Sequence, residues 1–126
     1  MKIEVSIGEI VDKLTILDIK MVNIIDQKKL ENVSKEFNYL KDIVEIDLGI
    51  STTSEIYLKL LDINKELWDI EDDIRDKERN REFDERFIEL ARAVYFTNDK
   101  RADVKKEINL KFGSTFVEEK SYQDYK

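Results

Sequence analysis

The chain has 126 residues and a net charge of −7, and it contains no His, Cys or Pro. The missing Cys and His exclude disulfides, thiolate or imidazole metal ligands, and Ser-His or Cys-His nucleophile pairs. The negative charge disfavours nucleic acid and anionic membranes as partners, because the electrostatic attraction has the wrong sign. No apolar run approaches the roughly 18 residues of a membrane span. We therefore expect one soluble, cytoplasmic domain over residues 1–126, with no cofactor and no metal.

The segment "VSIGEI" predicts the start of the first helix. Ser6 and Glu9 have the spacing of a capping box, and Val5 and Ile10 that of a hydrophobic staple. Apolar residues then recur at steps of three and four, at Ile10, Leu14, Leu17, Met21 and Ile24. A second stripe follows a turn around Asp26, at Leu30, Val33, Phe37, Leu40 and Val44. The two stripes predict an αα-hairpin.

Gly49 and the polar run "STTSE" predict a loop, in which Thr52 and Glu55 offer a second possible capping box. The third helix is expected to end near Arg79 or Asn80. Its apolar stripe consists of Ile56, Leu60, Ile63, Leu67, Ile70 and Ile74.

A further stripe, formed by Phe83, Phe87, Leu90 and Val94, predicts the next helix. Helical periodicity resumes over residues 99–112, with Gly113 placed as the residue after the C-cap. The chain either continues as one helix through Thr97 and Asn98 or breaks there into two. The tail from residue 114 lacks this periodicity and could form a short strand pair with "KIEVS" near the start. The predicted fold class is all-α, a bundle of four or five helices.

One face of the third predicted helix is acidic. It carries Asp62, Glu66, Asp69, Asp73 and Asp76, on the side opposite the apolar stripe. Such a stripe is typical of a solvated surface. The alternative is half of a magnesium site of the kind used by helical nucleotide pyrophosphohydrolases, but no second acidic pair stands upstream at a suitable interval.

The strongest candidates for a binding site interrupt the apolar pattern. Glu71 and Arg75 share a flank of the third helix with Trp68. We expect this flank to be half-buried and its two charged residues to form an ion pair. If the last helix is continuous, Asn98, Arg101 and Lys105 point inward and need partners or a cavity. If it kinks at Asn98, both cations turn to solvent.

Asp18 and Glu71 are the candidate partners for these inward cations. A basic, partly enclosed pocket would suit a phosphate or carboxylate. The predicted ligand-binding set is Asp18, Trp68, Glu71, Arg75, Asn98, Arg101 and Lys105.

Three stretches, "VSIGEIVDKLTILDIK", "LWDIEDDIRDKE" and "FDERFIELARAVYFTNDKRADVKKEINLKFGSTFVEEKSY", resemble the signature blocks of a small domain-of-unknown-function family of bacteria and their phages. The resemblance implies a domain that can be appended to larger proteins, some of them linked with glycosyltransferases, and it implies no activity. The positions that match the family pattern are Gly8, Glu9, Asp12, Lys13, Trp68, Glu71, Asp72, Arg75, Asn98, Asp99, Arg101, Lys105, Asn109, Gly113, Ser114, Glu118 or Glu119, Lys120 and Tyr122.

Two classes of function remain open. The first is a non-catalytic binding or interaction module that pairs with itself or with a protein partner and holds a small anion near Arg75, Arg101 and Lys105. The second is a helical enzyme acting on a phosphorylated or dicarboxylate substrate, either a magnesium-dependent pyrophosphohydrolase or one similar to helical chorismate mutases. Nucleic-acid binding ranks lower, because acidic residues interrupt the basic cluster Lys100, Arg101, Lys105, Lys106 and Lys111.

Overall fold

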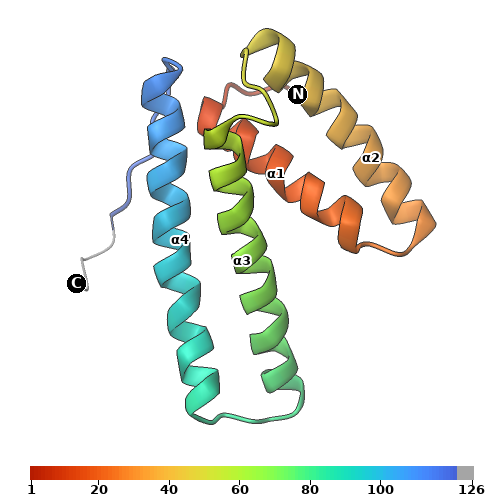
Figure 1. Cartoon of the computed structure of the whole chain (residues 1–126), viewed down its shortest axis with the longest axis vertical. Helices are drawn as coiled ribbons and strands as arrows, with labels where there is room; N and C mark the ends of the chain where they lie inside the picture. Colours follow the sequence, from red (N-terminus) through yellow and green to blue (C-terminus); the bar gives the residue numbers. More distant parts are fainter. Residues whose placement is uncertain (122–126) are drawn as a thin grey trace.

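The computed structural model describes residues 1–121 of the chain and confirms the all-α class. Four α-helices form two hairpins (Figure 1). The first hairpin consists of α1 (Ile7–Asn23) and α2 (Gln27–Asp42), and the second of α3 (Glu55–Arg79) and α4 (Glu85–Lys111). A π-helical turn, η1 (Ile43–Asp47), extends α2. Its Val44 is fully buried, so the predicted second stripe continues past the end of α2.

Each α-helix begins at a residue whose side chain accepts a hydrogen bond from the backbone three residues later. These N-caps are Ser6, Asp26, Ser54 and Asp84. The N-cap at Ser6 confirms the prediction for α1. The prediction for α3 was wrong, because Ser54 caps the helix by accepting from the Tyr57 N–H, while Thr52 instead donates to Glu45 at 3.4 Å.

The last helix is continuous through Thr97 and Asn98. Thr97 is buried and Asn98 does not act as a cap, so the alternative of a break is excluded. The helix ends as predicted: Gly113 has φ 68°, and the Ser114 N–H donates to the Asn109 carbonyl at 2.8 Å, as in a Schellman motif. Phe83 precedes the N-cap and lies in the loop between α3 and α4.

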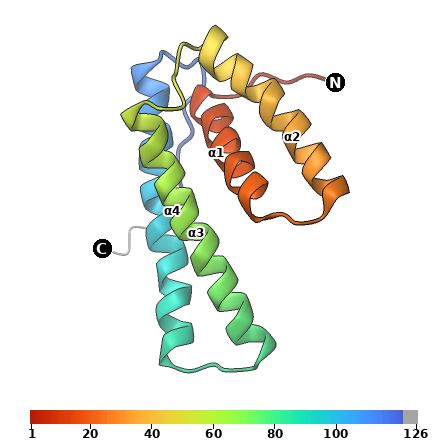
Figure 2. The same cartoon turned by 45° about the vertical axis from the view of Figure 1, so that its right-hand side comes forward.

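The two hairpins differ in length, and α1 is the helix of the first hairpin that packs against the second (Figures 1 and 2). At 1.5 Å per residue, α3 and α4 are about 38 and 40 Å long, whereas α1 and α2 are about 25 Å. Helix α1 packs against α2, α3 and α4, and the core forms around Val11 and Leu14 of α1, Tyr57 and Leu60 of α3, and Ile108 of α4. Helix α2 has no buried residue. Because α3 and α4 are longer than α1 and α2, their ends nearest the connecting loop extend beyond the first hairpin (Figure 1).

The predicted strand pair between the two ends of the chain does not occur within residues 1–121. The segment after Gly113 instead lies against the start of α1 through side-chain hydrogen bonds. The Ile7 N–H donates to Ser114 Oγ at 3.0 Å, and Ser6 Oγ donates to Glu118 at 3.3 Å. These contacts run through side chains, and no backbone ladder forms among the described residues. The remainder of the predicted tail, residues 122–126, lies outside the described residues.

The first turn of α1 is pressed against the backbone of α4 at Gly8. A Cβ atom at this position would lie 2.5 Å from the Lys105 carbonyl oxygen and 3.0 Å from Asn109 Oδ1. The Gly8 N–H donates to the same Asn109 oxygen at 2.6 Å. Only glycine allows this approach.

Replacing Gly8 by alanine should therefore destabilise the domain by about 1 to 3 kcal/mol, because the added methyl group forces α1 away from α4. The sign is diagnostic, since the same change inside an unconstrained helix stabilises by up to about 1 kcal/mol. Urea unfolding followed by circular dichroism measures the difference. An unchanged or raised midpoint for Gly8→Ala would contradict the close approach.

Candidate functional site

The inward-facing arginine of the predicted site pairs with Asp12, not with Asp18 or Glu71. Asp12 is only 1% exposed. Arg101 Nε donates to Asp12 Oδ1 at 2.9 Å, and Arg101 Nη2 binds Asp12 Oδ2, so the contact is bidentate. Asn64 Nδ2 donates to the same carboxylate at 2.9 Å and to Thr15 Oγ1 at 2.7 Å. A buried charge thus obtains both a counter-ion and hydrogen-bond donors, which offsets the cost of its desolvation.

Lys105 lies one turn further along α4 and is also paired. Its Nζ is 2.7 Å from Glu9 and 3.5 Å from Glu118, and its side chain is largely buried. The hydrogen bond from Lys105 holds the pKa of Glu9 below its ordinary value of 4.5, despite partial burial, which acts in the opposite direction. We call Glu9, Asp12, Arg101, Lys105 and Asn109 the α1–α4 polar network.

The N-terminus of α1 has no free donors for an anion. The first three N–H groups of the helix donate to Ser114 Oγ, Asn109 Oδ1 and Ser6 Oγ. A helix N-terminus attracts anions through such N–H groups, but here side chains of the same chain occupy them. The α1–α4 polar network is therefore built to hold α1 on α4.

The anionic-ligand site predicted around Arg75, Arg101 and Lys105 stays a prediction, and the geometry gives it little support. Arg101 and Lys105 are neutralised by carboxylates. Arg75 is far along α3 and pairs with Glu71 at 3.3 Å. Asn98 is partly buried on α4, one turn before Arg101.

The flank that carries Glu71 and Arg75 is more exposed than predicted. The Arg75 side chain is 71% exposed and the Glu71 side chain 44%. Helix α1 covers this flank at Tyr57 and Asn64. Helix α1 is too short to reach the last two turns of α3. Glu71 and Arg75 are therefore more exposed than the half-buried flank that the sequence predicted.

Asp18 and Trp68 lie together, but away from Arg75, Arg101 and Lys105. Both line a cavity of about 270 Å³ between α1 and α3, whose other walls include Ile19, Leu61 and Asp69. The Tyr57 hydroxyl donates to Asp18 Oδ2 at 3.3 Å. Burial, together with the Asp18 charge, raises the pKa of Tyr57. Six of the seven predicted residues are thus divided between this cavity, the α1–α4 polar network and the exposed end of α3, and Asn98 lies on α4 outside all three.

The acidic stripe of α3 is solvated, as expected. All five of its residues are exposed. Among residues 1–121, no group of three carboxylates is arranged to hold a metal ion. The geometry therefore gives no support to the magnesium-site alternative.

Sequence reasoning missed Asp12 as the centre of the polar network. The signal was present: Gly8, Asp12 and Thr15 follow one another at steps of four and three, which places them on one face of α1. Apolar stripes predict a helix face only where it is made of large apolar residues, and this face is made of a glycine, a carboxylate and a hydroxyl.

The fold and these sites define a small all-α domain in which a shorter helical hairpin packs against a longer one. No helix among the described residues is long and apolar enough to cross a membrane. A family model described as a family of unknown function, DUF6165, matches residues 1–125, and the chain belongs to this family. Neither the curated proteins nor the solved structures gave a match to the chain.

Removing the Arg101 side chain should destabilise the fold by about 3 kcal/mol, because the Asp12 carboxylate would remain buried without its counter-ion. We expect Arg101→Ala to lower the urea midpoint accordingly. Lys106→Ala is the matched control, since Lys106 forms an exposed pair with Glu119 at 3.0 Å, and its loss should cost less than about 0.5 kcal/mol. Equal effects of the two changes would contradict a structural role for Arg101.

The Glu9–Lys105 pair should contribute to acid sensitivity. Because the folded-state pKa of Glu9 is lowered, the pair stabilises the fold above the ordinary value of 4.5 and this stabilisation is lost as the pH falls below it. In Lys105→Met the pKa of Glu9 should rise, which carboxyl NMR titration measures directly. The corresponding part of the acid destabilisation should disappear. An unchanged Glu9 pKa in this variant would show that Lys105 does not cause the lowering of that pKa.

Proposed function

We propose that the chain is a non-catalytic interaction module that pairs with a second copy of itself through the uncovered end of the α3–α4 hairpin. The observation that carries the proposal is the mismatch in helix length. Helices α3 and α4 extend about 13 to 15 Å beyond the length of α1, and the extension keeps apolar side chains on the side where α1 would otherwise lie. The resemblance to a domain that is appended to larger bacterial proteins also supports a role in association.

The proposed contact surface continues the face on which α1 packs. On α4, Phe87 and Val94 precede Arg101 at steps of seven, so they lie on the side of the helix that meets α1 further along. On α3, Glu71 and Arg75 follow Asn64 on the side that α1 covers. We call this surface the distal face, and define it by Glu71, Ile74, Arg75, Phe83, Phe87 and Val94.

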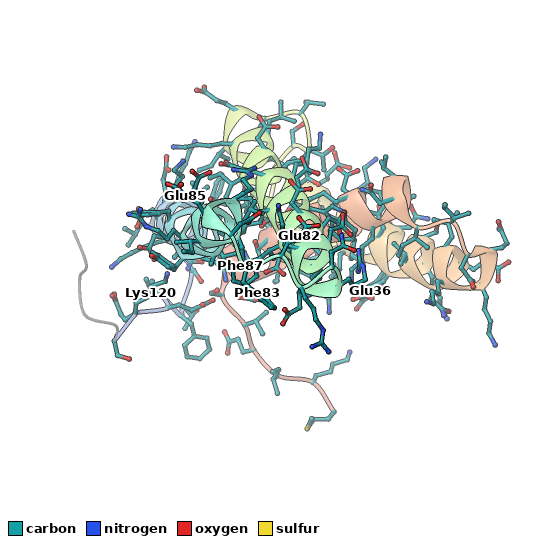
Figure 3. The ribbon with its side chains drawn as sticks, turned by 90° about the horizontal axis from the view of Figure 1, so that it is seen from below. Glu36, Glu82, Phe83, Glu85, Phe87 and Lys120 are labelled. Carbon is teal, nitrogen blue, oxygen red and sulfur yellow. The ribbon has the colours of Figure 1, made fainter. Side chains whose placement is uncertain are left out.

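The centre of the distal face is aromatic. The rings of Phe83 and Phe87 meet edge to face with centroids 5.3 Å apart, and Phe83 is 60% exposed. Figure 3, which views the molecule from below, shows both rings on one side of the hairpin. Ile74 and Val94 are only partly buried. An exposed Phe83 ring resting on a partly buried Phe87, on a two-helix extension, is the kind of surface that a protein contact covers.

The charges of the distal face favour a second copy as the occupant. Glu71 and Arg75 lie one turn apart with opposite charges, exposed beside the apolar residues. In a two-fold contact residue i meets residue j and j meets i. Two antiparallel copies of this face would therefore place each Glu71 opposite the Arg75 of the other copy, and two hairpins together would complete a four-helix bundle.

This proposal predicts a concentration-dependent dimer, measurable by analytical ultracentrifugation. Arg75→Glu should weaken the dimer about tenfold, because like charges then face each other across the axis. Glu71→Arg should act similarly. The double variant E71R/R75E restores opposite charges and should restore association. Arg86→Glu is the control, since Arg86 pairs with Glu89 at 3.3 Å and lies outside the distal face.

Phe83→Ser tests the apolar part of the surface separately. Because Phe83 is exposed and lies outside the helices, its replacement should weaken association while costing the monomer no more than its ring contact with Phe87, about 0.5 to 1.5 kcal/mol. A wild-type chain that remains monomeric at all concentrations, or that dimerises equally well with these changes, would overturn the proposal. Association only with a different protein through the same face would retain an interaction role and exclude the second copy.

A further inference from the structure

The cavity between α1 and α3 has the chemistry of a cation site. We propose that it binds a guanidinium or ammonium group carried on an aliphatic chain, such as an arginine side chain of a peptide or a free organic cation. The proposal does not depend on the distal face, because the cavity residues lie on α1 and the middle of α3.

The walls of the cavity combine an apolar base with an indole. Ile19 and Leu61 are buried residues of the core, and Trp68 packs against that core. Cations are attracted to the face of an indole by the electrostatic field of the ring. An aliphatic stem can lie on Ile19 and Leu61 while its charged end remains near Trp68. The volume of about 270 Å³ lies just below the usual range for ligand pockets, which suits one long side chain or a small molecule.

The carboxylates at the cavity supply the opposite charge. Asp12 binds Arg101 and Glu9 binds Lys105, whereas the partly buried Asp18 accepts a hydrogen bond only from the Tyr57 hydroxyl and forms no ion pair among the described residues. That hydroxyl leaves the second oxygen of Asp18 available. Asp69 on α3 lines the same cavity. A carboxylate placed in this way can accept a charge-assisted hydrogen bond from a ligand.

Other ligand classes fit the cavity less well. An anion would meet two carboxylates and a single ammonium group, that of Lys65. A metal ion would need more oxygen ligands, and within residues 1–121 no group of three carboxylates is arranged to provide them. A neutral apolar ligand would leave Asp18 partly buried without a counter-ion. The chemistry of the cavity therefore favours an organic cation.

Trp68 is the single tryptophan of the chain, so its fluorescence reports on the cavity directly. The probes are acetyl-arginine amide and acetyl-citrulline amide, which have nearly the same shape and differ in charge. We expect a saturable fluorescence change with the arginine probe, at a concentration at least tenfold lower than any change with citrulline. High salt should raise the half-saturation concentration.

Variants separate a specific site from general attraction to an acidic protein. Asp18→Asn should raise the half-saturation concentration about tenfold while keeping an acceptor for Tyr57. Asp69→Asn, an exposed position, provides the second test if Asp18→Asn fails to fold. Asp62→Asn removes the same charge from the exposed face of α3 outside the cavity and should change nothing. Equal responses to the two probes, or equal effects of Asp69→Asn and Asp62→Asn, would overturn the proposal.

A peptide source and a small-molecule source are distinguished by one more titration. A peptide containing arginine within flanking residues should bind more tightly than acetyl-arginine amide if the natural ligand is a protein segment. If the free cation binds at least as well as the peptide, the ligand is a small molecule. No response to either probe would contradict the proposed site.

Discussion

The contact between the first turn of α1 and the backbone of α4 determines the arrangement of the other helices. Gly8 allows the two backbones to approach, and its N–H binds Asn109. The ion pairs Asp12–Arg101 and Glu9–Lys105 form next to this contact. Once α1 is held against α4, its apolar residues fall between α3 and α4, and α2 can pack only on the outer side of α1. The charged residues of this region therefore act by positioning a helix.

Much of the fold could be predicted from the sequence, because helix signals are local. The apolar stripes, the caps at Ser6 and Gly113 and the loop at Gly49 all depend on residues within a few positions of one another. The error at Thr52 arose because two hydroxyl residues compete in the same loop, and only the path of the chain decides that Ser54 becomes the cap. The continuity of α4 depended on Asp12, a residue 89 positions away from Arg101, so no local pattern could decide it.

The candidate sites were harder to predict, since they depend on where one helix crosses another. The periodic pattern pointed Arg101 and Lys105 inward only if α4 was continuous, which the structure shows it to be, and the pattern could not show which carboxylates would meet them. It placed Glu71 and Arg75 on the flank that α1 covers, and this placement is right in direction. These residues are exposed because α1 is shorter than α3. An apolar stripe describes one helix and does not show how far a neighbouring helix extends along it. Asp18 and Trp68 lie together because α1 crosses α3 near its middle.

The hydrogen bond from Gly8 to Asn109 joins residues separated by 101 positions in the chain. At a synthesis rate of roughly 5 to 20 residues per second, the ribosome needs about 5 to 20 s to produce the partner after the donor has been made. During this interval the first hairpin exists without the helix that secures it. Its apolar side chains are then open to chaperones or to other nascent chains. The domain therefore acquires its native arrangement late in translation, after α4 has emerged, and a pause within the α4 codons would lengthen the vulnerable period.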